Sequence, residues 1–411
     1  MSTLFQEFTR NPGCVKLQGS VQHYAWGGYR FIPDLVGLNN SEKKPHAELW
    51  LGAHPKAPAT AVINEQNVPL TDLIDNATTT VLGKKVISQF GKNLPFLFKV
   101  LDVRDMLSIQ VHPSKNQAEN GFSIANEKNI ALDAPNRSYK DANHKPEVHV
   151  ALTDFWMLHG FRPEDDIARQ LKNVPEFAEL LSVFEKKGLK GLYSTVMRMP
   201  QNQVDEMLNP LIERLENINH LDKDHPDYWA RQAAESFPLP KGHRDRGLFS
   251  IYLFNLLHLK PGQGTFQPAG VPHAYLQGVN IELMANSDNV LRGGLTKKYI
   301  DVEALLDIVD YQGREPEILT GQSVSPREQV YPVPVSDFQL SRISLVSGDA
   351  IQLNEPAPSI GLVMDGIMFC HANGSKRRLE RGDAFFIPAA TNCRLISEYT
   401  TTLYRATVPV T

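Results

Sequence analysis

Two polar motifs interrupt apolar, strand-like runs of this sequence. The stretch LSIQVHPSK places Gln110 and His112 two residues apart, and HKPEVHVAL places Glu147 and His149 at the same spacing. Successive side chains of a strand point to opposite faces, so the members of each pair share a face. Buried polar groups need partners, so each pair should exchange hydrogen bonds, line a wet cavity or hold a metal ion. Histidine and carboxylate are usual zinc ligands, whereas glutamine is not.

A fifth candidate ligand is His273, which stands next to a turn in GVPHAYLQG. A β-barrel could bring all five residues together, but the spacing does not choose among them. Ordinary hydrogen-bonded strand residues are an equal alternative for each. The chain also contains rival histidines, namely His23, His46, His54, His144 and His159.

The segment LRGGLTKK could bind an anion. It sets Arg292 beside two glycines, which let the backbone approach a ligand closely, and follows them with Lys297 and Lys298. Such a group of cations suits a phosphate or a negative charge that develops during a reaction. The alternative is an ordinary glycine turn with solvated lysines.

The elements that must position these residues are mainly strands. Short apolar runs broken by Gly, Pro and Asn predict β-structure over residues 1–160, with a helix expected around residues 70–90. Apolar residues then recur at helical spacing, which predicts an inserted helical domain at residues 161–244, where Pro210 should bend or start a helix. Strand character returns at Leu248 and continues to the C-terminus, apart from a helix expected near DVEALLDIVD.

An internal echo supports two related β-domains. Residues 259–273 (LKPGQGTFQPAGVPH) and 379–393 (LERGDAFFIPAATNC) share Leu, Gly, Phe, Pro and Ala at five of fifteen positions. Both read as a strand end, a glycine turn, an aromatic strand and a Pro-Ala turn, which is typical of an antiparallel barrel or jelly roll. His273 corresponds to Cys393, so we expect a polar site in the first barrel and a structural role for the second.

The composition limits the partners. Lys and Arg number 42 and Asp and Glu 46, without a long run of one sign, which argues against nucleic acid and anionic membranes. We find no stretch of membrane-spanning length and no secretory signal. The cysteines Cys14, Cys370 and Cys393 are odd in number and widely spaced, which suits reduced thiols. We therefore expect a cytoplasmic protein, a monomer, with a small-molecule partner.

Six segments together resemble the type I mannose-6-phosphate isomerases, also called phosphomannose isomerases. In order they are AELWLGAHP, LPFLFKVL, LSIQVHPSK, HKPEV, FQPAGVPHAYLQG and IELMANSDNVLRGGLT. The resemblance is dense from about Gln22 to Val302 and covers the rest of the chain by organisation only. It implies a mainly β fold with a cupin or jelly-roll catalytic domain (residues 1–160 and 245–320), the helical insert (161–244) and a second, jelly-roll-like β-barrel domain (325–411).

The resemblance also implies an aldose–ketose isomerase with one zinc ion per chain. Its substrate would be a sugar phosphate, and a proton would move between C1 and C2 of mannose 6-phosphate and fructose 6-phosphate through an enediol or enediolate. The implied metal ligands are Gln110, His112, Glu147 and His273. The implied catalytic residues are Arg292, Lys145, Glu282, Asp288 and His144, and the implied substrate-binding residues are Lys99, Ser108 and Lys298.

Two residues depart from what the family leads us to expect. His149 stands in place of a small apolar residue. It adds a fifth candidate ligand, but we expect it to support the ligands rather than to bind the metal. Lys297 stands in place of proline. Asp288 could orient Arg292. Two other functions stay open, namely a cupin oxygenase that holds iron in the same ligands and a sugar-binding cupin without catalysis.

Overall fold

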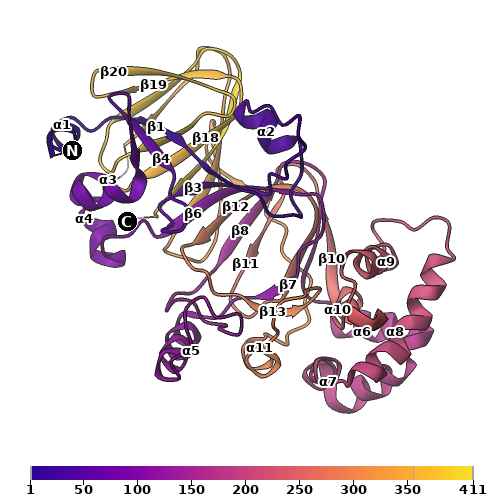
Figure 1. The fold of residues 1–411 in the computed structure, drawn as a ribbon. Helices are drawn as coiled ribbons and strands as arrows, with labels where there is room; N and C mark the ends of the chain where they lie inside the picture. The colour runs from indigo at the N-terminus through magenta and orange to yellow at the C-terminus, as the bar shows by residue number, and fades with distance from the viewer. Residues whose placement is uncertain (1, 355, 410–411) are drawn as a thin grey trace.

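The structure, a computed structural model, describes residues 2–354 and 356–409 (Figure 1). Among these residues, ten antiparallel strands form two facing layers, ordered β2-β3-β6-β12-β8-β11 and β10-β9-β12-β7-β13, which share β12. The ten strands are β2 (Ser20–Gln22), β3 (Glu48–Gly52), β6 (Phe96–Val103), β7 (Ile109–Val111), β8 (Glu147–Ala151), β9 (Phe155–Phe161), β10 (Phe254–Leu259), β11 (Gly264–Gln267), β12 (His273–Ala285) and β13 (Leu291–Gly294). The mainly β barrel that the sequence predicts is therefore present.

Strand β12 serves both layers because it changes partners at a glycine. Its first residues pair with β7 and β9, and from Gly278 onwards it pairs with β6 and β8. Gly278 has a φ of +121°, and a Cβ there would lie 2.4 Å from the carbonyl oxygen of Asp154. Only glycine combines this conformation with this close approach. One strand can therefore send side chains from both of its halves into the same interior.

A second β-part contains the C-terminal strands and three strands from the N-terminal part of the chain. Its nine-stranded sheet has the order β14-β15-β16-β23-β18-β21-β1-β4-β5, and a smaller sheet has the order β17-β22-β19-β20. The strands are β1 (Val15–Gln18), β4 (Thr60–Ile63), β5 (Gln66–Pro69), β14 (Gln322–Ser325), β15 (Glu328–Tyr331), β16 (Gln339–Leu345), β17 (Ala350–Leu353), β18 (Ser359–Asp365), β19 (Ile367–Ala372), β20 (Ser375–Glu380), β21 (Ala384–Ile387), β22 (Cys393–Ser397) and β23 (Thr401–Thr407). Strand β1, near the N-terminus, pairs with β21, near the C-terminus, so both terminal parts of the chain belong to this sheet. The domain boundaries given above stay a prediction.

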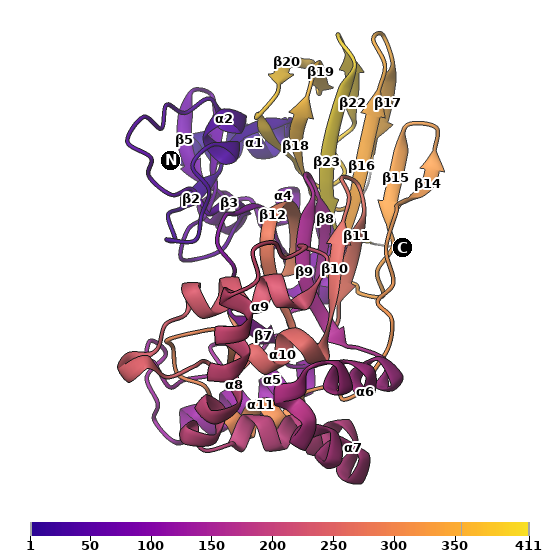
Figure 2. The same ribbon diagram turned by 90° about the vertical axis from the view of Figure 1, so that its right-hand side faces the viewer.

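The helices of the insert gather at the end of the molecule that is remote from β19 and β20 (Figures 1 and 2). The helices and 3-10 turns are α1 (Ser2–Arg10), α2 (Phe31–Val36), α3 (Leu70–Asn76), α4 (Thr78–Phe90), α5 (Lys115–Glu127), α6 (Glu164–Asn173), η1 (Pro175–Phe177), α7 (Ala178–Arg198), α8 (Gln201–Glu216), α9 (Pro226–Ser236), η2 (Pro240–Gly242), α10 (Gly247–Leu253) and α11 (Val302–Ile308). Within the described ranges no helix has the length and apolar character needed to cross a bilayer. Helices α3 and α4, the insert and α11 confirm the helices predicted from the sequence.

Pro210 lies inside a helix rather than at its start. Helix α8 begins at Gln201, with Pro200 before it, and continues through Pro210 to Glu216. The apolar residues that form its buried face recur at helical spacing, namely Val204, Leu208, Leu211, Ile212 and Leu215. Burial of this face outweighs the backbone hydrogen bond that proline cannot make.

The expected strand at Leu248 is wrong for its first six residues. Residues 247–253 form helix α10, and the strand β10 begins only at Phe254. Every residue of α10 is buried. An element that is apolar on all sides shows neither helical nor strand periodicity, so the sequence could not distinguish the two.

The internal echo corresponds to a repeated structure. Strand β11 begins five residues after Leu259, and strand β21 begins five residues after Leu379, so the two segments carry strands at equivalent positions. His273 begins β12 and Cys393 begins β22. Cys393 is packed in an apolar cluster that includes Cys370. The first copy therefore supplies a polar interior residue and the second an apolar one, as expected.

Candidate metal centre

Three of the implied ligands converge inside the barrel. His112 directly follows β7, Glu147 begins β8 and His273 begins β12, and all three are buried. His112 Nε2 lies 3.3 Å from Glu147 Oε1, and His273 Nε2 lies 3.5 Å from Glu147 Oε2. One donor atom from each residue lies within 4.8 Å of the other two. Residues far apart in the sequence thus present a carboxylate and two imidazoles to one point.

The two imidazoles are oriented as metal ligands need to be. His112 Nδ1 lies 2.8 Å from the carbonyl oxygen of Asn289, and His273 Nδ1 lies 3.2 Å from that of Val271. A carbonyl accepts only from a protonated nitrogen, so each Nε2 keeps a lone pair directed at Glu147. His112 Nε2 is buried and has no hydrogen-bond partner among the described residues. This donor set fits a divalent metal ion.

Glu147 is held in its ionised form. Burial raises the pKa of this carboxyl group, but the positive charge of Lys145 is the largest of the effects that oppose burial, and together they bring the pKa well below its usual range. Lys145 Nζ lies 3.0 Å from Glu147 Oε1. A carboxylate that stays ionised across the physiological range is an effective ligand for a cation.

Gln110 shares a face with one of the three ligands, His273, because of the strand register. It is opposite His273 on β12 and opposite Arg292 on β13. Residues directly opposite each other in antiparallel strands project from the same face. The amide of Gln110 and the guanidinium of Arg292 therefore share the face of His273.

A second polar row crosses the other layer. Lys99 on β6 is opposite Glu282 on β12, and Glu282 is opposite His149 on β8. Lys99 Nζ lies 2.8 Å from Glu282 Oε2 and 3.6 Å from Glu48 Oε2. Burial lowers the pKa of Lys99, but the two carboxylates reverse this and raise it above its usual range. Lys99 is thus a permanent cation paired with Glu282.

Tyr275 connects this second row with the ligands, and it was not among the residues predicted from the sequence. Its hydroxyl oxygen lies 2.8 Å from Glu282 Oε1, 2.8 Å from His149 Nδ1 and 3.4 Å from Glu147 Oε2. Burial, together with the neighbouring carboxylates, raises the pKa of Tyr275 well above its usual value. The signal was present, because Tyr275 is two residues from His273 on one strand and so shares its face.

His144 and Asp288 lie at a neighbouring cavity rather than among the ligands. Both line a cavity of about 970 Å³, which also includes His54 and Asp337. His144 Nε2 lies 3.0 Å from Asp337 Oδ1. The carboxylate of Asp288 contacts His54 at 3.5 Å and a lysine, Lys56, at 2.7 Å.

The partners of Asp288 differ from the one suggested by the sequence. Its described contacts are to His54 and Lys56, so the structure gives no support to orientation of Arg292 by Asp288. Burial raises the pKa of Asp288, but hydrogen bonds from His54 and Lys56 lower it below its usual range. Asp288 and Arg292 are four residues apart, but Asp288 lies in a loop, where spacing in the sequence does not determine which side chains are in contact.

Asn289 is a further residue that the sequence pattern did not reveal. Its side chain is fully buried, with Oδ1 accepting from the backbone N–H of Lys140 at 2.6 Å and Nδ2 donating to the carbonyl of Asn143 at 2.9 Å. Its own carbonyl accepts from His112. Asn289 therefore fixes the loop before Lys145 relative to a metal ligand.

The remaining predicted residues lie around β7 and β13. Ser108 is half-buried and directly precedes β7. Arg292 is half-buried on β13, and burial lowers its pKa. Burial, followed by the charge of Arg292, lowers the pKa of the exposed Lys298. Neither cation forms an ion pair with a carboxylate in the described part of the chain, so both can receive an anion.

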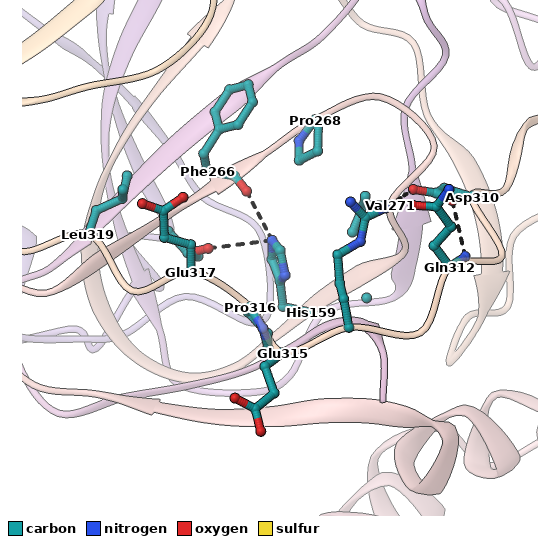
Figure 3. Close-up of a pocket in the computed structure, with 13 residues that line it drawn as sticks. His159, Phe266, Pro268, Val271, Asp310, Gln312, Glu315, Pro316, Glu317 and Leu319 are labelled. Carbon is teal, nitrogen blue, oxygen red and sulfur yellow. Dashed lines mark hydrogen bonds and ion pairs between the residues drawn. The ribbon is translucent and has the colours of Figure 1, made fainter. Parts of the chain in front are cut away.

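The rival histidines are engaged elsewhere. His23 Nδ1 contacts the carbonyl of Pro45, and His46 Nδ1 contacts that of Lys44. His159 Nε2 donates to the carbonyl of Phe266 at 3.1 Å and lines a separate cavity of about 220 Å³ (Figure 3). Burial lowers the pKa of His159 to about 4.

A two-layered antiparallel barrel with two inward histidines and a carboxylate around one point is typical of a metal-dependent cupin. A model of the family "Phosphomannose isomerase type I, catalytic domain" matches residues 14–164. The mannose-6-phosphate isomerase of Salmonella typhimurium is 38% identical over 380 residues, covering 91% of this chain and 94% of that protein. The human mannose-6-phosphate isomerase is 35% identical over 413 residues, covering 92% and 94%. This chain therefore belongs to the type I phosphomannose isomerase family.

Solved structures agree with this assignment. Mannose 6-phosphate isomerase from Salmonella typhimurium, bound to its substrate fructose 6-phosphate and to zinc, matches with a TM-score of 0.86 and 36% identity over 97% of this chain and 100% of that one. A zinc-bound mannose 6-phosphate isomerase matches with a TM-score of 0.87. The resemblance and the cupin fold inferred from the sequence are thus confirmed.

Proposed function

We propose that this chain interconverts mannose 6-phosphate and fructose 6-phosphate by moving a proton between C1 and C2, with one zinc ion per chain. The observation that carries the proposal is the convergence of His112, Glu147 and His273 in the barrel of a family with this activity. The substrate class follows from the relative that was solved with fructose 6-phosphate and zinc.

The proposed zinc ligands are Gln110, His112, Glu147 and His273. Zinc supplies a Lewis acid that stabilises negative charge on the sugar oxygens. Because Gln110 and both histidines are neutral and Glu147 carries one negative charge, the occupied site keeps one net positive charge. A carboxylate at position 110 would cancel that charge, which gives the glutamine a chemical purpose.

Four residues are candidates for the proton transfer, and their positions rank them. Lys145 contacts the ligand Glu147 directly, and Glu282 is linked to it through the hydroxyl of Tyr275. His144 and Asp288 line the neighbouring cavity instead. We therefore place Lys145 and Glu282 before His144 and Asp288, since a general acid or base must reach the proton that it moves.

Cations around the face of Gln110 suit the rest of the substrate. Arg292 stays protonated near neutral pH, so its role is to hold sugar oxygens or the enediolate rather than to act as a base. Lys298 follows β13 and Ser108 directly precedes β7, and both are suited to bind the phosphate. Lys99 is suited to bind the sugar, with Glu282 fixing its position.

Two general properties complete the proposal. Phosphorylated sugars are charged and do not cross an apolar bilayer unaided, so we propose that the protein works in the cytoplasm, where such substrates are retained. We also expect it to act as a monomer, because every proposed ligand and cation comes from one chain.

The test is to incubate the purified protein with mannose 6-phosphate in deuterated water. We expect fructose 6-phosphate to form, with deuterium at C1 whenever the proton taken from C2 exchanges with solvent before its transfer. Binding of the sugar without any product would indicate a sugar-binding cupin, and oxygen uptake with bound iron would indicate an oxygenase. Either result would overturn the proposal.

A further inference from the structure

The buried carboxylate of Asp245 binds the chain segment that follows Arg292. Asp245 is 5% exposed and lies between the helical insert and α10. Its Oδ1 accepts from the backbone N–H of Gly247 at 2.7 Å and of Leu295 at 2.9 Å, and its Oδ2 accepts from that of Thr296 at 3.0 Å. One side chain thus satisfies two donors of the turn after β13 and one donor of α10.

The turn that Asp245 binds has an unusual backbone. Gly294 has a φ of +128°, and Leu295 has a φ of +52°, which a residue with a side chain rarely adopts. Such a conformation persists only where neighbouring groups hold it. The two bonds to Leu295 and Thr296 are placed to do so.

Close backbone packing adds to these bonds. A Cβ on Gly294 would lie 2.5 Å from Gly247 Cα, and a Cβ on Gly247 would lie 2.6 Å from the nitrogen of Leu295. Helix α10 and the turn therefore interlock with no room for a side chain at either glycine. Any movement of α10 would be transmitted to the turn.

We infer that Asp245 is a positioning residue that fixes Arg292 and Lys298 relative to the metal centre, an inference that rests on the proposed function. Arg292 lies three residues before Leu295, and Lys298 lies three residues after it. Both cations are attached to the turn that Asp245 holds. The carboxylate is required because both of its oxygens accept, whereas asparagine has one acceptor and would turn N–H donors toward a backbone N–H.

The main test is the Asp245→Asn variant of the full-length, zinc-loaded protein. We expect kcat for mannose 6-phosphate to fall by about a hundredfold, the scale for displacing a catalytic group by about 1 Å, with unchanged zinc content. Asp205→Asn is the matched control. Asp205 accepts a hydrogen bond from the backbone N–H of Arg244 at 2.8 Å and none from the turn after β13. The kcat of the Asp205→Asn variant should therefore stay near that of the original chain.

A double variant separates positioning from a general structural effect. If Asp245 acts through Arg292, then Asp245→Asn combined with Arg292→Lys should lose no more kcat than Arg292→Lys alone. Losses that multiply would overturn the inference, as would a normal kcat in Asp245→Asn. If Asp245→Asn does not fold, Gly247→Ala replaces it in the same cycle, because its added methyl group would push on Leu295.

The original chain, measured in the same assay, keeps the two proposals distinct. If that chain has no isomerase activity, the proposed function fails. If it is active and Asp245→Asn equals it, only the positioning role fails.

Discussion

The hydroxyl of Tyr275 lies 2.8 Å from Oε1 of Glu282, and both residues belong to strand β12. The same hydroxyl contacts His149 at 2.8 Å and Glu147 at 3.4 Å, so one oxygen links a metal ligand to the ion pair of Glu282 with Lys99. A phenol with so high a pKa remains a hydrogen-bond donor at any working pH. It therefore gives Glu282 a fixed neighbour inside the barrel.

We predict that Tyr275→Phe weakens both stability and turnover. The change takes a buried hydrogen-bond partner away from Glu282 and His149, which should lower the free energy of unfolding by about 1–3 kcal/mol. Urea denaturation and steady-state kinetics measure the two effects. Tyr311→Phe is the control and should keep kcat, because the Tyr311 hydroxyl donates to the carbonyl of Leu306 and not to a ligand. Equal kcat in both variants would contradict a role for this contact.

We predict that removal of the metal abolishes turnover while the fold remains. The ligands lie in a barrel whose large apolar clusters do not depend on an ion. The protein should therefore keep its circular dichroism after dialysis against a chelator and regain activity with about one zinc ion per chain. Full activity in a sample shown to be free of metal would refute the central proposal.

We predict that Glu147→Gln loses far more zinc than His149→Ala. Glu147 is the charged member of the converging set, whereas His149 Nε2 lies 4.0 Å from it and His149 Nδ1 contacts Tyr275 instead. Mutation of a residue that only orients the ligands typically lowers the affinity for the metal by about 10–100-fold, whereas mutation of a charged ligand removes the site. The zinc content of each variant after gel filtration tests this prediction. A greater loss of zinc in His149→Ala would indicate that the metal is bound by the group of Glu147, His149 and Glu282 instead.

We predict that His159 makes stability depend on pH between about 6.5 and 4. Burial lowers the pKa of His159 to about 4, whereas an unfolded histidine titrates near 6.5. In this window the unfolded chain binds more protons, so stability is complete at neutral pH and falls as the pH decreases. At pH 5 the loss from this residue should be about 2 kcal/mol.

Denaturation of His159→Gln at pH 7 and pH 5 tests this effect. The variant should lose less stability between the two values than the original chain does. His225→Gln, at an exposed histidine, should leave the difference unchanged. An identical pH dependence in His159→Gln would show that other groups are responsible.

The sequence predicted those parts of the site that lie on regular strands. Alternation along β8 correctly placed Glu147 with His149, because the strand period fixes which side chains share a face, whereas the pairing of Gln110 with His112, which follows β7, stays a prediction. The same rule would have found Tyr275 from His273. Which strands face each other is a tertiary property, so the ligand set itself came from the family resemblance.

Residues that act through the backbone were not predictable. The side chains of Asn289 and Asp245 form hydrogen bonds with backbone groups of loops. Such contacts leave no periodic pattern in the sequence. The helix α5 was also missed, although Ser114 and Gln117 form a capping box that the sequence displays. The apolar run at Leu248 had no periodicity to interpret.

The last prediction concerns Arg292, which shares the face of Gln110 and has no carboxylate partner in residues 2–354 and 356–409. We expect its guanidinium to act on the chemical step, since a fixed cation beside the sugar stabilises the enediolate. Arg292→Lys keeps the charge but loses the planar fork that holds two oxygens at once. Turnover should therefore fall by about two to three orders of magnitude, with unchanged zinc content.

The kinetic pattern distinguishes this role from simple phosphate binding. If Arg292 mainly binds the phosphate, Arg292→Lys should raise KM for mannose 6-phosphate and leave kcat nearly intact, and unphosphorylated mannose should be indifferent to the change. Lys298→Ala is the comparison, because the exposed Lys298 is the residue proposed to bind the phosphate and should show that pattern itself. A normal kcat in Arg292→Lys would remove Arg292 from the catalytic residues and make Lys99 and Lys298 the cations that act on the reacting oxygens.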